Sequence, residues 1–122
     1  MSARNSDTAR AAEIVEAIAE ARARIDHFGI TRERFLQDDG IEMRALADSL
    51  LMCVYRVTEE AGNMSAATRA AHPEIDWRAI HGMRNILAHD YGNVDREIVW
   101  EAVQTDFDVL EAFCRAYLEE CS

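Results

Sequence analysis

The sequence predicts an all-α protein: an up-and-down bundle of four long helices with short helices between them. The 122 residues contain only one proline and five glycines, so little in the chain interrupts a helix. Ala, Glu, Arg, Leu and Met are abundant, and all five are good helix formers. In four segments, apolar residues recur at steps of three and four, which places them on one face of an α-helix. Short connections between such segments are typical of a helical bundle.

The N-terminal part is predicted to be a disordered segment, residues 1–6, followed by a single domain over residues 7–121. Ser6 or Asp7 can cap the first helix, which we expect to run to about His27. Apolar residues at helical spacing predict that one face of this helix packs against a core. That face comprises Ile14, Ile18, Ala21, Ile25 and Phe28.

Gly29 is the predicted stop signal of the first helix, because glycine readily adopts the left-handed conformation that ends helices. A short helix is predicted after Thr31, ending near Gly40. A long apolar pattern follows and predicts a helix over residues 41–62. Its buried stripe comprises Met43, Leu46, Leu50, Cys53, Val54, Val57 and Ala61.

Two further capping residues mark the helices that come next. Ser65 can cap a short helix that ends before Pro73, because the residue ahead of a proline avoids helical geometry. Asp76 can cap a helix that starts at Trp77 and ends at residues 92–93. The apolar side of this helix consists of Ile80, Met83, Ile86 and Leu87.

The last helix is predicted to begin after a cap at Asp95 and to reach about Glu120. Its apolar residues recur at helical spacing along the whole segment, so one face should be buried. That face comprises Ile98, Val99, Ala102, Val103, Phe107, Leu110, Phe113, Cys114 and Tyr117.

The chain is acidic, with a formal net charge of −10, and all 13 of its basic residues are arginine. This balance opposes nonspecific nucleic-acid binding, which needs a basic face to neutralise phosphates. A nucleic-acid site on this chain would require a locally positive cleft. Arg84 from both subunits of a dimer, together with Arg78 or Arg56, could supply such a cleft.

Three cysteines and a polar N-terminus bear on the compartment. Cys53, Cys114 and Cys121 have neither metal-ligand spacing nor an even count, so a disulfide framework is not expected. Cys53 and Cys114 lie among apolar neighbours and are predicted to be core thiols. We expect no signal peptide and no membrane span, and therefore a cytoplasmic protein.

The twelve residues from His81 to Gly92 combine a cation, an amide, two imidazoles, a carboxylate and a phenol with apolar side chains. On a helix, Asn85 and His89 share a face, with His81 one turn earlier. Arg84 and His89 are five residues apart, about 140° around a regular helix. They can share one site if the helix loosens or ends near His89, if Arg84 sweeps round, or if the groups converge across a dimer interface.

These residue types suit RNA cleavage without a metal ion or another cofactor. An imidazole exchanges a proton near neutral pH, so His89 could activate the ribose 2′-hydroxyl or protonate the leaving 5′-oxygen. Arg84 could hold the scissile phosphate and stabilise its transition-state charge. Asn85 could orient His89 or bind the phosphate, and Tyr91 could donate a hydrogen bond nearby. His81 and His89 are about 12 Å apart along a helix axis, too far to share one metal ion.

Structural interpretations of the same residues also stand. Arg84 could simply pair with Asp90 or Glu74, which are nearby acidic residues in the sequence. The Tyr91 ring could be a wedge whose hydroxyl faces water. His81 is predicted to be a flanking polar group, because nothing in its surroundings indicates a reactive role.

Arg84, four residues, His89, one residue and Tyr91 form an arrangement that resembles the Arg-x4-His-x-Tyr signature of HEPN ribonucleases. The resemblance is to the small HepT-like toxins of nucleotidyltransferase/HEPN toxin–antitoxin pairs. It extends over most of the chain, from the first helix to the last. It is strongest over residues 72–80, 82–91 and 94–100.

A weaker likeness covers residues 52–59, where HepT-like chains often carry an Arg-x-x-Gly-Glu pattern. Arg56 and Glu59 fit this pattern, whereas Thr58 stands in place of the glycine. The family also commonly has a small residue after the motif histidine, where this chain has Asp90. A carboxylate at that place would oppose RNA by its charge.

The resemblance implies a HEPN-like domain over residues 7–121 that forms a homodimer, with the two motif helices near a shared cleft. It implies a metal-independent endoribonuclease toxin of a type VII toxin–antitoxin system that cleaves tRNA or mRNA. It further implies a nucleotidyltransferase-fold antitoxin that silences the toxin by transferring AMP to Tyr91. The alternative is a noncatalytic HEPN module that binds nucleotide or a partner within a nucleotidyltransferase complex.

Overall fold

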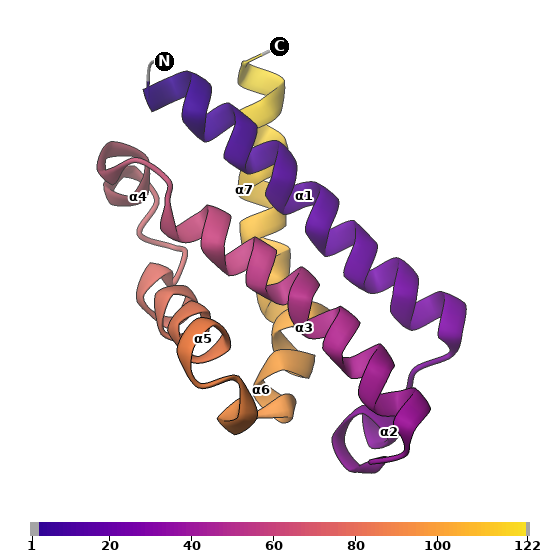
Figure 1. Cartoon of the computed structure of the whole chain (residues 1–122). Coiled ribbons are helices and arrows are strands. Elements are labelled where there is room, and N and C mark those ends of the chain that lie inside the picture. Colours follow the sequence, from indigo (N-terminus) through magenta and orange to yellow (C-terminus); the bar gives the residue numbers. More distant parts are fainter. Residues whose placement is uncertain (1–2, 122) are drawn as a thin grey trace.

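The computed structural model describes residues 3–121, which form helices, turns and short connections without a β-strand. The long elements are four: α1, α3, α5 and the α6–η2–α7 segment (Figure 1). η1 is a 3₁₀-helical turn and η2 is a π-helical segment. In chain order the elements are α1 (Ala3–Phe28), α2 (Arg32–Gln37), α3 (Ile41–Gly62), α4 (Ala66–Ala71), α5 (Trp77–His89), η1 (Tyr91–Asn93), α6 (Arg96–Glu101), η2 (Ala102–Asp106) and α7 (Phe107–Glu120).

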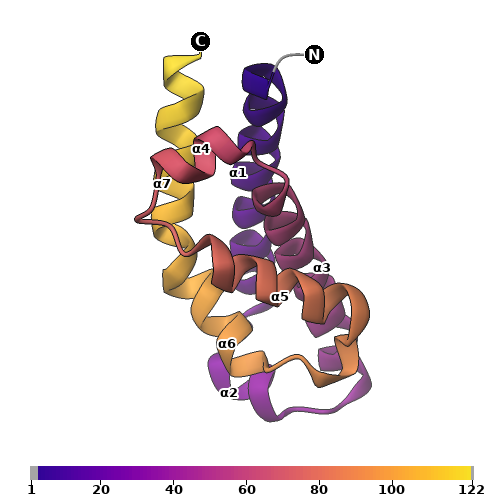
Figure 2. The same cartoon turned by 90° about the vertical axis from the view of Figure 1, so that its left-hand side faces the viewer.

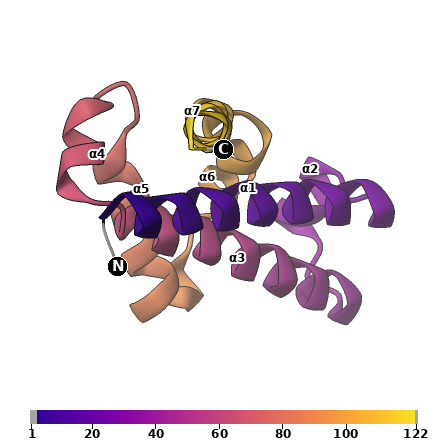
Figure 3. The same cartoon turned by 90° about the horizontal axis from the view of Figure 1, so that it is seen from above.

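The helices pack as an up-and-down bundle in which α1 contacts both α3 and α7, and α5 lies against α3. The beginning of α1 and the end of α7 lie at one end of the bundle, and α2 lies at the other (Figures 1 and 2). Viewed from above, α7 appears end-on and α4 is set to one side, near the start of α1 (Figure 3). This arrangement confirms the predicted all-α bundle. None of the described helices is long and apolar enough to cross a lipid bilayer.

The core is a continuous cluster of apolar side chains drawn from every long helix. Cys53 and Cys114 are both buried within it, as predicted, and burial raises the pKa of the Cys114 thiol to about 12. α5 contributes least, because Leu87 is its one buried side chain. The largest fully buried apolar side chains are Phe35, Ile14, Ile18, Met43, Leu50, Met64, Leu110, Val54, Val57 and Val99.

Local signals placed most helix boundaries correctly. The side chains of Thr31, Ser65, Asp76 and Asp95 accept hydrogen bonds from backbone N–H groups in the first turns of α2, α4, α5 and α6. These bonds satisfy donors that a helix leaves unpaired at its start. Gly29 ends α1 with a φ of 59°, in the left-handed region that favours glycine.

The start of the first helix was predicted too late. α1 begins at Ala3, so Ser6 and Asp7 lie inside it rather than at its cap. Residues 1 and 2 of the segment predicted to be disordered lie outside the described residues, whereas residues 3–6 are helical. The capping interpretation failed because Asp7 binds another helix instead.

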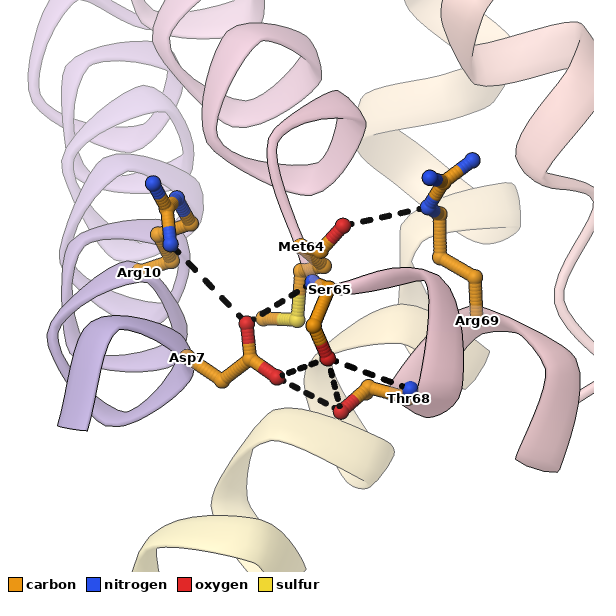
Figure 4. A network of polar contacts seen from close by, with 6 residues as sticks. All are labelled: Asp7, Arg10, Met64, Ser65, Thr68 and Arg69. Atoms are coloured by element: carbon orange, nitrogen blue, oxygen red, sulfur yellow. Dashed lines mark hydrogen bonds and ion pairs between the residues drawn. The ribbon is translucent and has the colours of Figure 1, made fainter. Parts of the chain in front are cut away.

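Hydrogen bonds to Asp7 connect the start of α1 to the start of α4 (Figure 4). It is 1% exposed, and it accepts hydrogen bonds from the Ser65 backbone N–H at 2.9 Å, the Ser65 hydroxyl at 2.7 Å and the Thr68 hydroxyl at 2.6 Å. Arg10 lies 3.9 Å away and adds an ion pair. Burial raises the pKa of Asp7, but the hydrogen bonds and Arg10 outweigh it and hold the pKa below its ordinary value.

The predicted single last helix is interrupted by the π-helical segment η2. The Phe107 N–H bonds to the carbonyl oxygen of Ala102, five residues back, so the turn holds one extra residue. The extra residue changes the direction of the helix, so that α6 and α7 can pack against different helices. α6 packs on α2, where Trp100 lies 5.6 Å from Phe35 between ring centroids, and α7 packs on α1 (Figure 2). Apolar residues at steps of three and four fit a continuous helix as well as a helix with a π-helical turn, so the sequence pattern could not reveal η2.

Three side chains predicted to be buried are exposed. Phe28 is 48% exposed at the end of α1, and Ile86 and Ile98 are 41% and 55% exposed on α5 and α6. The stripe pattern identified the correct helices, but these positions lie at the edge of each buried face. Ile86 and Ile98 line the same groove, which is described below.

Candidate active site

The polar side chains of the motif lie on α5 and on η1, which follows it, and their partners lie on α3, which packs against α5 (Figure 2). Asp48, Tyr55 and Glu59 are spaced seven and four residues apart, so they share one face of α3. This face meets the motif, because Glu59 contacts Arg84 and Asp48 contacts Tyr91. The two helices run antiparallel, so the two contacts lie at opposite ends of the same stripe.

Arg84 is bound to a carboxylate of its own chain. Its Nε donates to Glu59 Oε2 at 2.6 Å, and its Nη1 donates to Asn85 Oδ1 at 3.3 Å. Asn63 Nδ2 donates to the other Glu59 oxygen at 3.1 Å. The hydrogen bond from Arg84 is the largest cause of the lowered pKa of Glu59, and the same bond raises the pKa of Arg84. The guanidinium is therefore held in place and its charge is partly neutralised.

Asn85 joins Arg84 to His81 rather than to His89. Its carbonyl oxygen accepts from Arg84, and its amide nitrogen lies 3.3 Å from His81 Nε2. His81, Asn85 and His89 were predicted to share one face of the helix. Among the described residues, Asn85 contacts His81 and forms no hydrogen bond with His89. His81 was predicted to be a flanking polar group, and in the structure its ring contacts the Asn85 amide.

His89 is the last residue of α5 and its side chain is exposed. The helix stays regular to its end, where the Asp90 N–H bonds to the Ile86 carbonyl oxygen at 2.8 Å. One prediction was that Arg84 and His89 could share a site if the helix ended near His89. The helix does end there, but Arg84 extends toward α3 and not toward His89. Among the described residues, no hydrogen bond or ion pair joins Arg84 to His89. A single chain therefore does not bring the two predicted catalytic groups together.

Tyr91 begins η1, directly beyond α5, and its ring is 44% exposed. Its hydroxyl does not face water alone: it donates to Asp48 Oδ1 at 2.5 Å. Burial, followed by the hydrogen bond and the charge of Asp48, raises the pKa of Tyr91 to about 12. The tyrosine is thus held protonated against α3.

Other charged residues considered in the sequence have separate partners. Asp90 accepts a hydrogen bond from Asn93 at 2.8 Å, and Glu74 lies 3.0 Å from His72. Neither binds Arg84. Arg56, which was expected to add positive charge to a cleft, forms an ion pair with Glu13 of α1. Arg78 is exposed on α5 and remains able to contribute.

An apolar groove of about 770 Å³ lies between α5 and the α6–η2–α7 segment. Ile86, Ile98 and Val109 line it and are 41%, 55% and 50% exposed, which is unusual for large apolar side chains. None of the described lining residues is basic, and four are acidic. Those four are Glu74, Asp76, Asp95 and Asp106.

Sequence reasoning missed the acidic partners of the motif. Glu59 was identified only through a weak pattern, and Asp48 was not identified at all. Asp48, Tyr55 and Glu59 share one face of α3, but polar residues at helical spacing are also typical of a solvent-exposed face, so the spacing alone did not reveal their contacts. The described residues contain no group of three or more His, Cys, Asp or Glu side chains that could hold a metal ion.

Comparisons with known proteins agree with the resemblance to the HepT-like family. The family model described as ribonuclease HepT-like matches residues 13–117. A protein of Caldanaerobacter subterraneus subsp. tengcongensis, provisionally named an RNase, is 30% identical over 92 residues, which are 75% of this chain and 78% of that protein. A protein of Thermococcus cleftensis, provisionally named ribonuclease HepT, is 30% identical over 99 residues, which are 81% of this chain and 87% of that protein.

No solved structure gives a significant match to this chain. The family match nevertheless spans α1 to α7, including the motif and the weaker pattern on α3. Together with the helical bundle and the two relatives, it confirms the resemblance read from Arg84, His89 and Tyr91. The chain belongs to the HepT-like ribonuclease family.

Proposed function

We propose that this chain is a metal-independent endoribonuclease toxin of a type VII toxin–antitoxin system, acting on tRNA or mRNA in the cytoplasm. Arg84 and His89 cleave RNA in a cleft between two copies of the chain, with Asn85 and Tyr91 in supporting roles. A nucleotidyltransferase-fold antitoxin silences the toxin by transferring AMP from ATP to Tyr91. The family match over residues 13–117, which contains the whole Arg-x4-His-x-Tyr motif, is the observation that carries this proposal.

The cleavage step uses the RNA's own 2′-hydroxyl as the nucleophile. His89 takes the proton of that hydroxyl, or returns one to the leaving 5′-oxygen, because an imidazole changes protonation state near neutral pH. Arg84 binds the phosphate and stabilises the charge that develops on it. The products are a 2′,3′-cyclic phosphate and a 5′-hydroxyl. His89 is exposed at the end of α5, so RNA can reach it.

A second copy completes the site in this proposal. Arg84 and His89 are about 140° apart around the regular helix α5, and Arg84 extends toward Glu59 of α3 rather than toward His89. The groove beside α5 exposes Ile86, Ile98 and Val109, and covering large apolar side chains is favourable. In this proposal, a second copy covers the groove and its α5 lies close to the α5 of the first copy. The Arg84 of one copy would then face the His89 of its partner.

AMP transfer to Tyr91 would silence the enzyme by charge and bulk. The modified side chain would carry a phosphodiester anion two residues from His89, where it would repel the phosphates of RNA. Tyr91 is reachable for modification, since its ring is 44% exposed. Mass spectrometry of the chain produced together with its antitoxin would detect an adenylyl group on a Tyr91-containing peptide.

The second candidate is a noncatalytic module that binds a nucleotide or a partner. One observation favours it: Glu59 partly neutralises Arg84 in the isolated chain, which weakens the attraction of Arg84 for RNA. A cleavage assay separates the two candidates. Purified chain is incubated with tRNA and with mRNA in the presence of a metal chelator, and the product ends are identified by their reactivity with kinase and phosphatase.

We expect cleavage that survives chelation, and a loss of about 100-fold or more in the rate for Arg84→Ala and His89→Ala. Arg44→Ala and His27→Ala are matched controls, because each alters an exposed side chain of the same type on another helix. Cleavage at the wild-type rate by His89→Ala would refute the mechanism. The absence of any cleavage by the unmodified wild-type dimer would favour the binding module.

A further inference from the structure

Tyr91 and Asp48 form a contact that the cleavage reaction does not use. The Tyr91 hydroxyl donates to Asp48 Oδ1 at 2.5 Å, although the two residues are 43 positions apart in the chain. Asp48 lies on α3 and is exposed, and Tyr91 follows α5 in η1. A carboxylate at this place repels RNA phosphates, so it does not help the enzyme bind its substrate. Its position on the phenolic oxygen suits a different reaction of the same tyrosine.

Transfer of AMP to a tyrosine requires the phenolic oxygen to lose its proton. The pKa of Tyr91 is raised to about 12, first by burial and then by the hydrogen bond and charge of Asp48. Almost no phenolate therefore exists at neutral pH, and a base must remove the proton while the new bond forms. In protein kinases, an aspartate performs this task for the hydroxyl that attacks a nucleotide phosphate.

We propose that Asp48 is a catalytic residue for AMP transfer to Tyr91, accepting the phenolic proton as the oxygen attacks the α-phosphorus of ATP. This inference rests on the proposed silencing of the enzyme by AMP transfer. The structure already holds donor and acceptor at hydrogen-bond distance, so no rearrangement within the chain is needed before the proton moves. The base is thus supplied by the modified protein itself.

The step balances without another reactant. A bond forms between Tyr91 Oη and the α-phosphorus of ATP, while the bond from that phosphorus to the bridging oxygen of the β-phosphate breaks. Pyrophosphate leaves with the electron pair, and the phenolic proton passes to the Asp48 carboxylate. Asp48 is exposed, so it can release the proton to water. The product is an adenylyl-tyrosine that has lost the hydrogen with which Tyr91 bound Asp48.

The product state differs from the starting state in one further way. The new phosphodiester carries a negative charge beside the Asp48 carboxylate, and like charges repel each other at this distance. The modified Tyr91 can no longer donate its hydrogen bond and is repelled by Asp48, so the contact between η1 and α3 should weaken. The reverse reaction would then be slow, because Asp48 would no longer lie beside the phenolic oxygen that has to be protonated.

The test uses the full chain, the proposed nucleotidyltransferase-fold antitoxin, and ATP labelled at the α-phosphate. Initial rates of label transfer are measured against chain concentration for wild type, Asp48→Asn, Asp48→Glu, Tyr91→Phe and Glu42→Gln. Glu42 is a matched control, since it is an exposed acidic residue on the same helix. Thermal unfolding by circular dichroism checks that each variant is folded.

We expect Asp48→Asn to lower kcat for transfer by about 100-fold or more with little change in KM, because general-base catalysis typically contributes that much. Asp48→Glu should recover part of the rate, Glu42→Gln should match wild type, and Tyr91→Phe should accept no label. The pH profile adds a second readout. Transfer to Asp48→Asn should rise with pH up to the region where Tyr91 ionises on its own, whereas transfer to wild type should level off earlier.

Three results would overturn the inference. A faster reaction of Asp48→Asn would show that preformed phenolate is the nucleophile, because removing the Asp48 charge lowers the pKa of Tyr91. A raised KM with unchanged kcat would assign Asp48 to docking of the nucleotidyltransferase. Absence of label on wild-type Tyr91 would refute AMP transfer itself, and this inference with it, while leaving the RNA-cleavage proposal to its own assay.

Discussion

At the scale of single residues, the main feature of the site is the ion pair between Arg84 and Glu59. The Nε of Arg84 donates to the carboxylate at 2.6 Å, and its Nη1 donates to Asn85 Oδ1 at the longer distance of 3.3 Å. A phosphate can bind the remaining edge of the guanidinium while Glu59 keeps the side chain fixed. Glu59 then has two opposing effects on RNA cleavage, because it orients Arg84 and also weakens its attraction for phosphate.

Glu59→Gln separates these effects by removing the charge and keeping the shape. We expect kcat for RNA cleavage to fall by about tenfold, because Arg84 loses the acceptor that fixes its orientation. We expect KM to fall as well, because a negative charge leaves the site. Initial rates of cleavage measured against RNA concentration give both quantities. Glu60→Gln removes the same charge from the next residue of α3 and should leave kcat near the wild-type value.

At the scale of elements, the sequence predicted the parts that depend on local chemistry. The caps at Thr31, Ser65, Asp76 and Asp95, and the stop at Gly29, were correct because each acts within its own turn of backbone. The π-helical turn was not predictable, because it depends on the two different neighbours of α6 and α7. Local patterns do not contain that information.

The same limit applies to the candidate site. Arg84, His89 and Tyr91 were selected because their spacing resembles a family signature, and their roles in the site stay predictions. Their partners Glu59 and Asp48 were not predicted, because these contacts depend on how α3 packs along α5. The sequence distance between Tyr91 and Asp48 is 43 residues, far beyond the reach of helical periodicity.

The start of α1 shows how one side chain can join two elements. Asp7 was predicted to cap its own helix, and it binds the first turn of α4 instead. We expect Asp7→Asn to lower the free energy of unfolding by about 2 kcal/mol at pH 7, because a buried charge-assisted set of hydrogen bonds is weakened. Urea unfolding measures this change, with Asp26→Asn as a control on an exposed aspartate of the same helix.

The effect of Asp7 should depend on pH. Its pKa in the folded protein lies below the ordinary value of 3.8, so its contribution to stability is present above that value. As the pH falls through the lowered pKa, the carboxylate is protonated in both states and the contribution is lost. The difference between wild type and Asp7→Asn should therefore be constant from pH 5 to 7 and should narrow below about pH 4. A difference that stays constant to pH 3 would contradict this assignment.

At the scale of the whole molecule, the proposed site is divided between two chains. One chain holds Arg84 against α3 and leaves His89 exposed at the end of α5, and a regular helix separates their directions by about 140°. The groove lined by Ile86 and Ile98 provides an apolar face for a second copy. The groove is also lined by four acidic residues, so dimer formation brings like charges close together. Because salt screens this repulsion, a higher salt concentration should strengthen the association.

A mixing experiment tests the division directly. Arg84→Ala and His89→Ala each inactivate every site of their own dimers, in any arrangement. When the two variants are refolded together, about half of the dimers should be mixed, and one of the two sites in each mixed dimer would keep both residues if the site is shared. Activity should therefore return to about a quarter of the wild-type value. If both residues of a site came from one chain, every site would lack one of them and mixing would restore nothing. Replacing Ile98 with Asp in both variants should abolish the recovery, because an apolar interface does not accommodate an unpaired carboxylate.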